Sequence, residues 1–485
     1  MIKRMSVNQV IKLKCEGHTA EYEITNVINL FLPYVKSAYY LEALFKEDMA
    51  EVNLFLNESK VMESKHKVES NQNETIHKKN VKETLKRVVY EVLSELTGQH
   101  MPWGILTGIR PTKIVHDYLS QGLAEESISL MLKDDYKISN DKIKLMIEVA
   151  KQELDILSRN KRDEISVYIG IPFCPTRCVY CSFTAYSLEK KANWVDPYLE
   201  ALCKEIDYVA KAKGGIPIRS LYIGGGTPTS LNETQLLRLL THIKKSFDLS
   251  AIEEYTVEAG RPDTITREKL IIMKQMDVNR ISINPQSMNQ KTLDTIGRKH
   301  TIEDIIRVFH LAREIGHQNI NMDIILGLPN ESVKDVENTL IELSKLSPEN
   351  ITVHTLAVKR ASRLKEEKDE YHLTEPGSIE QMLDLSEKHI ATMGLRPYYM
   401  YRQKNMLGNF ENVGYASPGK ECIYNIEIME EKESIIALGA GAITKMVYQN
   451  GERIDRVANV KSLEDYISRI DEMIERKKLG FEKYK

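Results

Sequence analysis

The chain contains the segment Ile165-Ser-Val-Tyr-Ile-Gly-Ile-Pro-Phe-Cys174-Pro-Thr-Arg-Cys178-Val-Tyr-Cys181. The segment begins with a short, mostly apolar run, which is typical of a strand buried on both faces of a parallel sheet. Three cysteines follow directly. Because active sites of parallel α/β folds lie on loops at the carboxyl ends of strands, this segment predicts a thiol-based site at such an end.

The sequence after this segment alternates between short apolar runs and amphipathic helical stretches. Strands are predicted at 165–171, 220–223, 255–258, 280–283, 320–326 and 351–357. Helices are predicted at 194–211, 233–246, 266–276, 301–315, 334–346 and 378–393. Consecutive βα units form a parallel sheet with right-handed crossovers. Since six units are fewer than the eight of a closed barrel, we expect an α/β fold with a partial (β/α)6 TIM-like barrel.

Accessory regions are expected on both sides of a barrel domain at 161–394. Residues 1–160 are predicted to form an N-terminal α/β and helical domain, which ends at the hydrophilic stretch 160–164. Residues 395–485 are expected to form a C-terminal α/β extension that covers the site.

Finer elements are also predicted in these two regions. Alternation predicts strands at 11–15 and 50–56 with a helical stretch between them, and residues 58–80 are polar enough for an exposed excursion. Helical spacing of apolar residues follows at 81–96 and 112–158. In the C-terminal region a strand is predicted at 396–402 and a helix at 460–474.

Composition excludes several classes of function. The 485 residues are 42% hydrophobic and 28% charged, as in an ordinary globular protein. With 67 basic against 70 acidic residues, a general nucleic-acid surface or anionic-membrane surface is not expected. No apolar run reaches the roughly 18 residues of a membrane span. The start, Met1-Ile-Lys-Arg4, is not followed by the apolar core of a secretory signal, so we expect a cytoplasmic protein.

Unusual residues also stand at the ends of the other predicted strands. Gly224-Gly-Gly-Thr-Pro228 follows the second strand, Glu258 ends the third, and Asn284-Pro-Gln286 follows the fourth. Asp323 lies inside the apolar fifth strand, where an unpaired charge is costly, and Gly327-Leu-Pro329 follows it. These positions share one edge of the predicted sheet, which therefore carries the candidate site.

The cysteine spacing favours an iron–sulfur cluster. Structural zinc takes four ligands, and no second cysteine or histidine pair follows nearby. A [4Fe–4S] cluster normally takes four thiolates, so three leave one iron open. Zinc and simple packing remain as alternatives. The isolated Cys15, Cys203 and Cys422 are more typical of small buried residues.

The run Tyr168-Ile-Gly-Ile-Pro-Phe-Cys174, together with Cys178-Val-Tyr-Cys181-Ser-Phe183, resembles the radical S-adenosylmethionine (SAM) superfamily. Four further motifs resemble the oxygen-independent coproporphyrinogen III oxidase family: Gly224–Pro228, Arg280-Ile-Ser-Ile-Asn-Pro-Gln-Ser287, Gly297-Arg-Lys299 and Asp323-Ile-Ile-Leu-Gly-Leu-Pro329. The N-terminal region and the run from Tyr401 to Tyr415 are similar to its HemZ-type branch, the coproporphyrinogen dehydrogenases.

This resemblance implies a barrel of the radical SAM type and a specific chemistry. The open iron would bind SAM, and an electron from a donor such as flavodoxin or ferredoxin would cleave it to methionine and a 5′-deoxyadenosyl radical. That radical would abstract hydrogen from a propionate side chain. Loss of carbon dioxide and one electron would leave a vinyl group. Two such steps would convert coproporphyrinogen III into protoporphyrinogen IX, in anaerobic haem biosynthesis.

The resemblance also implies roles for individual residues. Cys174, Cys178 and Cys181 match the cluster ligands. The first SAM would contact Tyr168, Gly225 and Glu258. A second SAM would contact Tyr180, Gly226, Thr227, Gln286, Arg298, Asp323 and Ala357, of which Gln286 and Arg298 are also assigned to catalysis.

One departure from the family pattern leaves other functions open. Bacterial coproporphyrinogen oxidases carry a further cysteine two positions after the third ligand, where this chain has Phe183, as the family's haem chaperones do. Phe183 could line a substrate pocket or simply pack. A haem chaperone is therefore the alternative, with His354 as a possible haem ligand or a packed residue. Radical chemistry on another tetrapyrrole is a third possibility.

A substrate with four carboxylates also requires cations. Candidates are Lys359, Arg360, Arg363, Arg396, Arg402 and Lys404, each of which is by itself more typical of a solvated surface charge. The loop Thr107-Gly-Ile-Arg-Pro-Thr-Lys113 could reach the site or be an ordinary turn before a helix.

Overall fold

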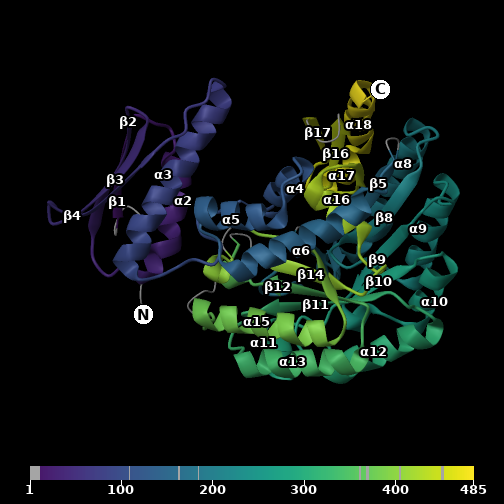
Figure 1. Cartoon of the computed structure of the whole chain (residues 1–485). Helices are drawn as coiled ribbons and strands as arrows, with labels where there is room; N and C mark the ends of the chain where they lie inside the picture. Colours follow the sequence, from purple (N-terminus) through teal and green to yellow (C-terminus); the bar gives the residue numbers. More distant parts are fainter. Residues whose placement is uncertain are drawn as a thin grey trace. The chain divides into compact units, whose positions relative to one another are not determined.

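A computed structural model describes residues 11–108, 110–161, 164–183, 185–359, 362–366, 371–403, 406–448 and 453–484. The chain forms two compact units, residues 1–148 and 149–485, which we describe separately (Figure 1). The division falls within helix α6 (Asn140–Leu157). The three-part division at 160 and 394 stays a prediction.

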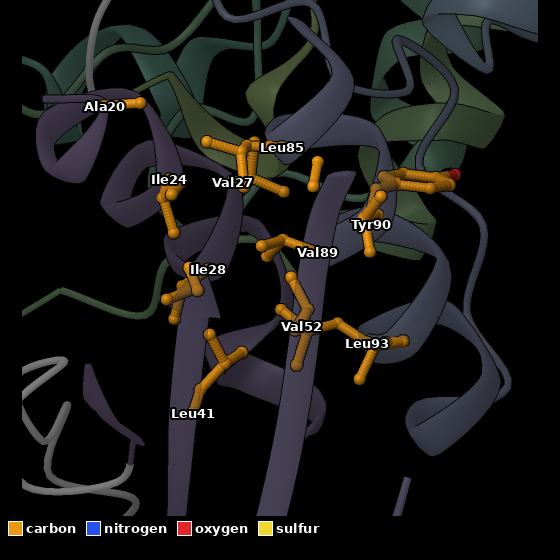
Figure 2. Packing of buried hydrophobic residues seen from close by; sticks show 14 of the residues in the cluster. Ala20, Ile24, Val27, Ile28, Leu41, Val52, Leu85, Val89, Tyr90 and Leu93 are labelled. Carbon is orange, nitrogen blue, oxygen red and sulfur yellow. The ribbon is translucent and has the colours of Figure 1, made fainter. Parts of the chain in front are cut away.

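The first unit contains a four-stranded sheet in the order β1-β2-β3-β4. Strand β1 (Ile11–Glu16) is parallel to β2 (Tyr39–Lys46), and β2, β3 (Met49–Leu56) and β4 (Ser59–Lys67) run antiparallel. Apolar side chains of helices α2 (Glu21–Phe31) and α3 (Glu74–Thr97) pack against the sheet in one buried cluster, which includes Ile28, Leu41, Val52 and Val89 (Figure 2). Burial of these side chains stabilises the unit.

Two of its strands differ from the sequence-based expectation. Residues 39–46 form β2 in a stretch without a predicted strand, and the polar stretch 58–80 contains β4 and the start of α3. Strand β4 lies at the edge of the sheet and is largely exposed, so its residues lack the apolar pattern of a buried strand. Helix α3 begins earlier than predicted because the Asn73 side chain accepts hydrogen bonds from the N–H groups of Thr75 and Ile76. Helices α4 (Thr112–Ser120) and α5 (Glu125–Tyr136) follow.

The second unit is built on one large sheet, which within the described residues has eleven strands. Six neighbouring strands at its centre are parallel and follow one another in chain order, as predicted: β5 (Ile165–Ile171), β8 (Ile218–Gly225), β9 (Glu254–Gly260), β10 (Arg280–Ile283), β11 (Ile320–Leu326) and β12 (Asn350–Thr355). Almost every residue of these strands is buried, which explains their continuous apolar pattern. The predicted parallel α/β sheet is confirmed.

The predicted helices connect these strands, with bounds within two residues of expectation: α8 (Val195–Ala212), α9 (Glu233–Ser246), α10 (Arg267–Gln275), α12 (Ile302–Ile315), α13 (Val333–Leu346) and α15 (Pro376–Thr392). Figure 1 shows them in a curved row along the outside of the sheet. Three begin at capping boxes, on Asn232, Thr301 and Ser332, where side chains satisfy the free N–H groups of the first turn.

The C-terminal segment extends this sheet at both edges. Strand β14 (Asn412–Ala416) pairs antiparallel with β12, and β13 (Arg396–Tyr401) lies beyond it. At the other edge β15 (Ser434–Leu438) pairs parallel with β5, followed by β16 (Ile443–Tyr448) and β17 (Arg453–Ala458). Only β13 was predicted here, because β14 and β15 are short and wholly buried and so show no alternation.

The predicted helix at 460–474 is two helices, α17 (Leu463–Ser468) and α18 (Ile470–Tyr484). Across the described ranges of the chain, none of the helices has the length and apolar character needed to cross a bilayer.

Candidate functional site

The three clustered cysteines lie on a loop that is held at both of its ends. Directly after β5, the two-residue strand β6 (Phe173–Cys174) pairs with β7 (Tyr186–Ser187), which closes the loop. Thr227 supports its first cysteine: its N–H donates to the Phe173 carbonyl at 2.7 Å, and its Oγ1 lies 3.5 Å from Cys174 Sγ. The loop backbone is therefore fixed against the end of β8.

The three thiols are free and close enough to influence one another. Burial, together with the neighbouring Cys181 and Cys178, raises the pKa of Cys174 to about 11. Burial also raises the pKa of Cys181. A buried thiol resists ionisation on its own, whereas a metal that binds its thiolate supplies the missing charge. This donor set is suited to a bound metal cluster.

The glycines after β8 allow the backbone to pass close to this loop. Gly225 has a backbone φ of +108°, which residues other than glycine rarely adopt. A Cβ on Gly226 would lie 2.5 Å from the Phe173 carbonyl oxygen. At Gly224, a Cβ would lie 2.7 Å from the Glu258 carboxylate, and the Gly225 N–H lies 3.3 Å from Glu258 Oε2. Glu258 therefore faces the glycine run directly.

Tyrosine side chains lie around Glu258, next to the glycine run. The Tyr222 hydroxyl donates to Glu258 Oε1. The Tyr222 ring stacks on Tyr424 at 4.4 Å between centroids, and Tyr168 stacks on Tyr424 at 5.8 Å. Burial raises the pKa of Glu258, and the neighbouring Asp323 raises it further. Glu258 therefore ionises at a higher pH than an exposed carboxyl group, and it offers a polar group beside the glycine run.

A second group of predicted residues gathers around Asp323. Gln286 takes up a left-handed conformation, φ +67°, and its N–H donates to the Asp323 carbonyl at 2.9 Å. The Asp323 carboxylate accepts from Asn321 Nδ2 at 2.7 Å and lies 3.7 Å from His354 Nε2. Burial alone would raise the pKa of Asp323, but the neighbouring His354 and the hydrogen bond from Asn321 lower it. Asp323 is thus an anion in the barrel interior.

His354 is not the packed residue that was one of the two alternatives considered from the sequence. It lies on β12, and its ring is 26% exposed and faces Asp323. Its Nδ1 lies 3.4 Å from the Tyr401 hydroxyl. These contacts make it part of the polar interior of the barrel.

Arg298 is a buried cation without a carboxylate partner. Its Nη1 donates to the Asn284 carbonyl at 2.8 Å and its Nη2 to the Tyr180 hydroxyl at 3.1 Å. Its Nε has no hydrogen-bond partner, and no ion pair reaches the side chain within the described part of the chain. Arginine has five donors in a fixed fork, so this side chain keeps capacity for an anionic ligand group.

The remaining candidates are more dispersed. Ala357 forms a β-bridge with Met406, just after β12. Arg402 is 3% exposed and donates to the Asn409 carbonyl at 2.8 Å, so it is packed rather than a solvated charge. Arg396 is exposed at the start of β13, and Arg363 is exposed on α14 (Arg363–Glu366). Arg360 and Lys404 lie outside the described residues. The loop 107–113 belongs to the first unit.

Arg261 contributes to the site without having been singled out from the sequence. Its Nε and Nη2 bind the Asp263 carboxylate at 2.9 and 2.6 Å. Its Nη1 donates to Thr176 Oγ1 at 2.7 Å and to the Thr176 carbonyl at 3.2 Å. Thr176 lies between the first two cysteines, so Arg261 clamps the cysteine loop from the end of β9. The segment Arg261-Pro-Asp263 reads as an ordinary polar turn, which gives no local signal of this contact.

Comparison with known proteins agrees with this geometry. Residues 168–343 match the family model of the Radical SAM superfamily. The solved structure of coproporphyrinogen III oxidase (HemN) from Escherichia coli is similar in fold, with a TM-score of 0.51, 24% identity, and coverage of 67% of this chain and 73% of that chain. The three free, partly or fully buried thiols, the glycine run and the open Arg298 fit the [4Fe–4S] cluster and SAM that this superfamily implies.

Sequence relatives define the family more closely. The oxygen-independent coproporphyrinogen-III oxidase-like protein HemZ of Bacillus subtilis is 45% identical over 404 residues, which cover 82% of this chain and 81% of that protein. The heme chaperone HemW of the same organism is 34% identical over 62% of this chain and 76% of its own length. The chain therefore belongs to the oxygen-independent coproporphyrinogen-III oxidase-like (HemZ-type) family of radical SAM proteins.

Proposed function

We propose that this protein oxidatively decarboxylates propionate side chains of coproporphyrinogen III to vinyl groups, in a radical reaction that uses SAM. Arg298 is the observation that carries this proposal. Near the cysteine loop, a cation that is 7% exposed and has no carboxylate partner among the described residues is suited to an anionic ligand group. The second set of SAM residues predicted from the sequence includes this arginine, Tyr180 and Asp323.

The residues of this chain would divide the work as follows. Cys174, Cys178 and Cys181 would hold the cluster, and Thr227 and Arg261 keep their loop in place. Glu258 and the Gly225 backbone would orient one SAM, while Arg298 would bind the carboxylate of a second. When bound, the cluster and SAM supply the radical that removes one hydrogen atom from the substrate. Each propionate would lose that hydrogen atom, one carbon dioxide molecule and one electron, which an external electron acceptor would take up.

The test is an anaerobic assay with reconstituted cluster, SAM, a reductant and coproporphyrinogen III. We expect methionine and protoporphyrinogen to form together. Cys174→Ser should lose both the four-iron absorbance and the products. Cys203→Ser, on the outer helix α8, is the matched control and should keep both. If the wild-type protein forms neither product, the proposal is wrong, and mass analysis of the tetrapyrrole will show whether another modification takes place instead.

A haem chaperone is the second candidate function. Two observations favour it: Phe183 stands where the family's coproporphyrinogen oxidases carry a cysteine, and HemW of Bacillus subtilis is similar over 62% of the chain. His354 is partly exposed and would be the side chain to test as a haem ligand. Stoichiometric haem binding that is lost in His354→Ala, without any turnover of coproporphyrinogen, would support this function over the enzyme.

A further inference from the structure

Phe183 is an exposed apolar ring beside the cysteine loop. Its side chain is 66% exposed, so the packed alternative considered from the sequence does not apply. The Phe183 backbone hydrogen-bonds to Cys181, which places this residue at the rim of the cluster site. A single exposed apolar ring is ordinary on a protein surface, so it is the position of Phe183 beside the cysteine loop that makes it a candidate for ligand contact.

Lys359 lies against this ring from a different part of the chain. Its Nζ is 5.9 Å from the centre of the Phe183 ring, within the range of a cation–π contact. No carboxylate pairs with it in the described ranges of the chain. It follows β12 by four residues, and its carbonyl accepts from the Ser362 N–H at 3.1 Å and from the Ser362 hydroxyl at 2.7 Å.

The two residues are held together by a backbone contact between their segments. The Leu364 N–H donates to the Val179 carbonyl at 2.9 Å, which joins the segment after β12 to the cysteine loop. Leu364 and Ser362 are fully buried, so this contact is protected from water. This backbone contact therefore holds the Phe183 ring and the Lys359 ammonium group next to each other.

We infer that Phe183 and Lys359 form a subsite for the tetrapyrrole substrate, in which a pyrrole ring packs on Phe183 and a propionate pairs with Lys359. A tetrapyrrole with four propionates offers both the apolar ring and the negative charge that this pair can bind. SAM also has a planar ring, but it has a single carboxylate where the tetrapyrrole has four, and SAM binding is the alternative outcome of the experiment. This subsite deepens the proposed function and rests on it.

The experiment measures binding of coproporphyrin III to the cluster-reconstituted protein under anaerobic conditions, by fluorescence quenching. We expect Phe183→Ala and Lys359→Ala each to weaken binding about 10-fold, and Lys359→Arg to restore most of the affinity. The double variant should lose less than the product of the two single effects, because the residues act as a pair. Leu237→Ala and Lys244→Ala, on the outer face of α9, are the matched controls.

Two further measurements identify the ligand. Lys359→Ala should leave the affinity for coproporphyrin tetramethyl ester unchanged, since the ester has no carboxylate to lose. Both variants should keep the four-iron absorbance and bind SAM as the wild type does. If SAM binding falls while coproporphyrin binding does not, the pair serves SAM and the inference is wrong.

Failure of this inference can be distinguished from failure of the proposed function. If the wild type converts coproporphyrinogen III and both variants bind coproporphyrin normally, the subsite is elsewhere while the enzyme function stands. If the wild type binds coproporphyrin through these two residues but forms no vinyl product, the subsite stands and the decarboxylation is wrong.

Discussion

The two ends of the central sheet each contain a buried arginine, and the two differ in what surrounds them. Arg219, at the start of β8, is paired with carboxylates: its Nη1 lies 3.0 Å from Glu427 and its Nε 3.1 Å from Glu253. Its Nη2 donates to the Ile156 carbonyl at 3.0 Å. Arg298, at the carboxyl end, contacts only a carbonyl and a phenol among the described residues.

This difference separates a structural charge from a ligand-binding one. A buried charge is costly unless a partner compensates it, and Arg219 has its partners inside the chain. Arg298 lacks such a partner, so the folded protein tolerates an energetic cost that a ligand anion would remove. At these two positions, the charge of Arg219 is therefore neutralised within the chain, whereas Arg298 keeps the capacity to bind an anionic ligand.

The largest expected effect is on stability, at the amino end. Arg219→Met leaves Glu427 and Glu433 without their cation, and we expect the free energy of unfolding to fall by about 3–5 kcal/mol. Thermal and denaturant unfolding measure this loss. Variant protein that remains folded at low temperature should still cleave SAM, because Arg219 has no contact with the cysteine loop in the described structure. Unchanged stability would mean that Arg219 is not needed to compensate these carboxylates, and the contrast with Arg298 would be lost.

The second expected effect is on turnover, at the carboxyl end. Arg298→Met should reduce conversion of coproporphyrinogen III by about 30- to 5000-fold, because it removes one partner of a buried charge pair with the ligand, worth about 2–5 kcal/mol. The melting temperature of the ligand-free variant should equal or exceed that of the wild type, since an uncompensated buried charge is lost. A large drop in stability with normal turnover would mean that Arg298 has a structural role and does not bind a ligand.

The third expected effect is a pH dependence at the carboxyl end. Burial raises the pKa of Glu331 to about 7, and the Ser287 hydroxyl donates to its carboxylate at 2.5 Å. Because its folded pKa is above the usual 4.5, the folded state binds more protons, and stability is lost as pH rises from about 4.5 to 7. In Glu331→Gln, the fall in the free energy of unfolding between these pH values should be smaller than in the wild type by up to about 3 kcal/mol.

The measurement compares the free energy of unfolding at pH 4.5 and pH 8 in the wild type and in Glu331→Gln. The exposed Glu268→Gln on α10 is the matched control and should follow the wild type. If Glu331→Gln and the wild type show the same pH dependence, the acid is already ionised in the folded protein.

The smallest expected effect concerns the clamp on the cysteine loop. Lysine cannot bind both Asp263 and Thr176 as the guanidinium does, so Arg261→Lys should lose about 1 kcal/mol of loop stabilisation. We expect iron loss to a chelator to be about 5-fold faster, with an altered electron paramagnetic resonance spectrum of the reduced cluster. Arg267→Lys, which pairs with Glu314 on the surface, is the control. Equal rates of iron loss in both variants would exclude the clamp.

Much of the barrel could be predicted because its signals are local. Strands 280–283 and 320–326 have the predicted bounds, since a strand buried on both faces is a continuous apolar run between turns. The site residues at strand ends could be proposed because parallel strands bring their carboxyl ends to one edge. The roles of these residues in binding SAM remain predictions.

Other features could not be predicted because they depend on partners distant in sequence. Strand β15 pairs with β5 across more than 250 residues, and its five buried residues carry no alternation of their own. Arg261 reaches Thr176, and His354 faces Asp323, through contacts that no short pattern records.

The sequence by itself determined where the central strands lie, that three thiols follow the first of them, and that polar residues end the others. These are properties of neighbouring residues, set by burial and by spacing along the chain. Only the tertiary structure decided which buried arginine is neutralised and which is left open, and that Phe183 is exposed beside Lys359. Pairing and exposure depend on which side chains face each other across the fold, and that is not encoded in any single segment.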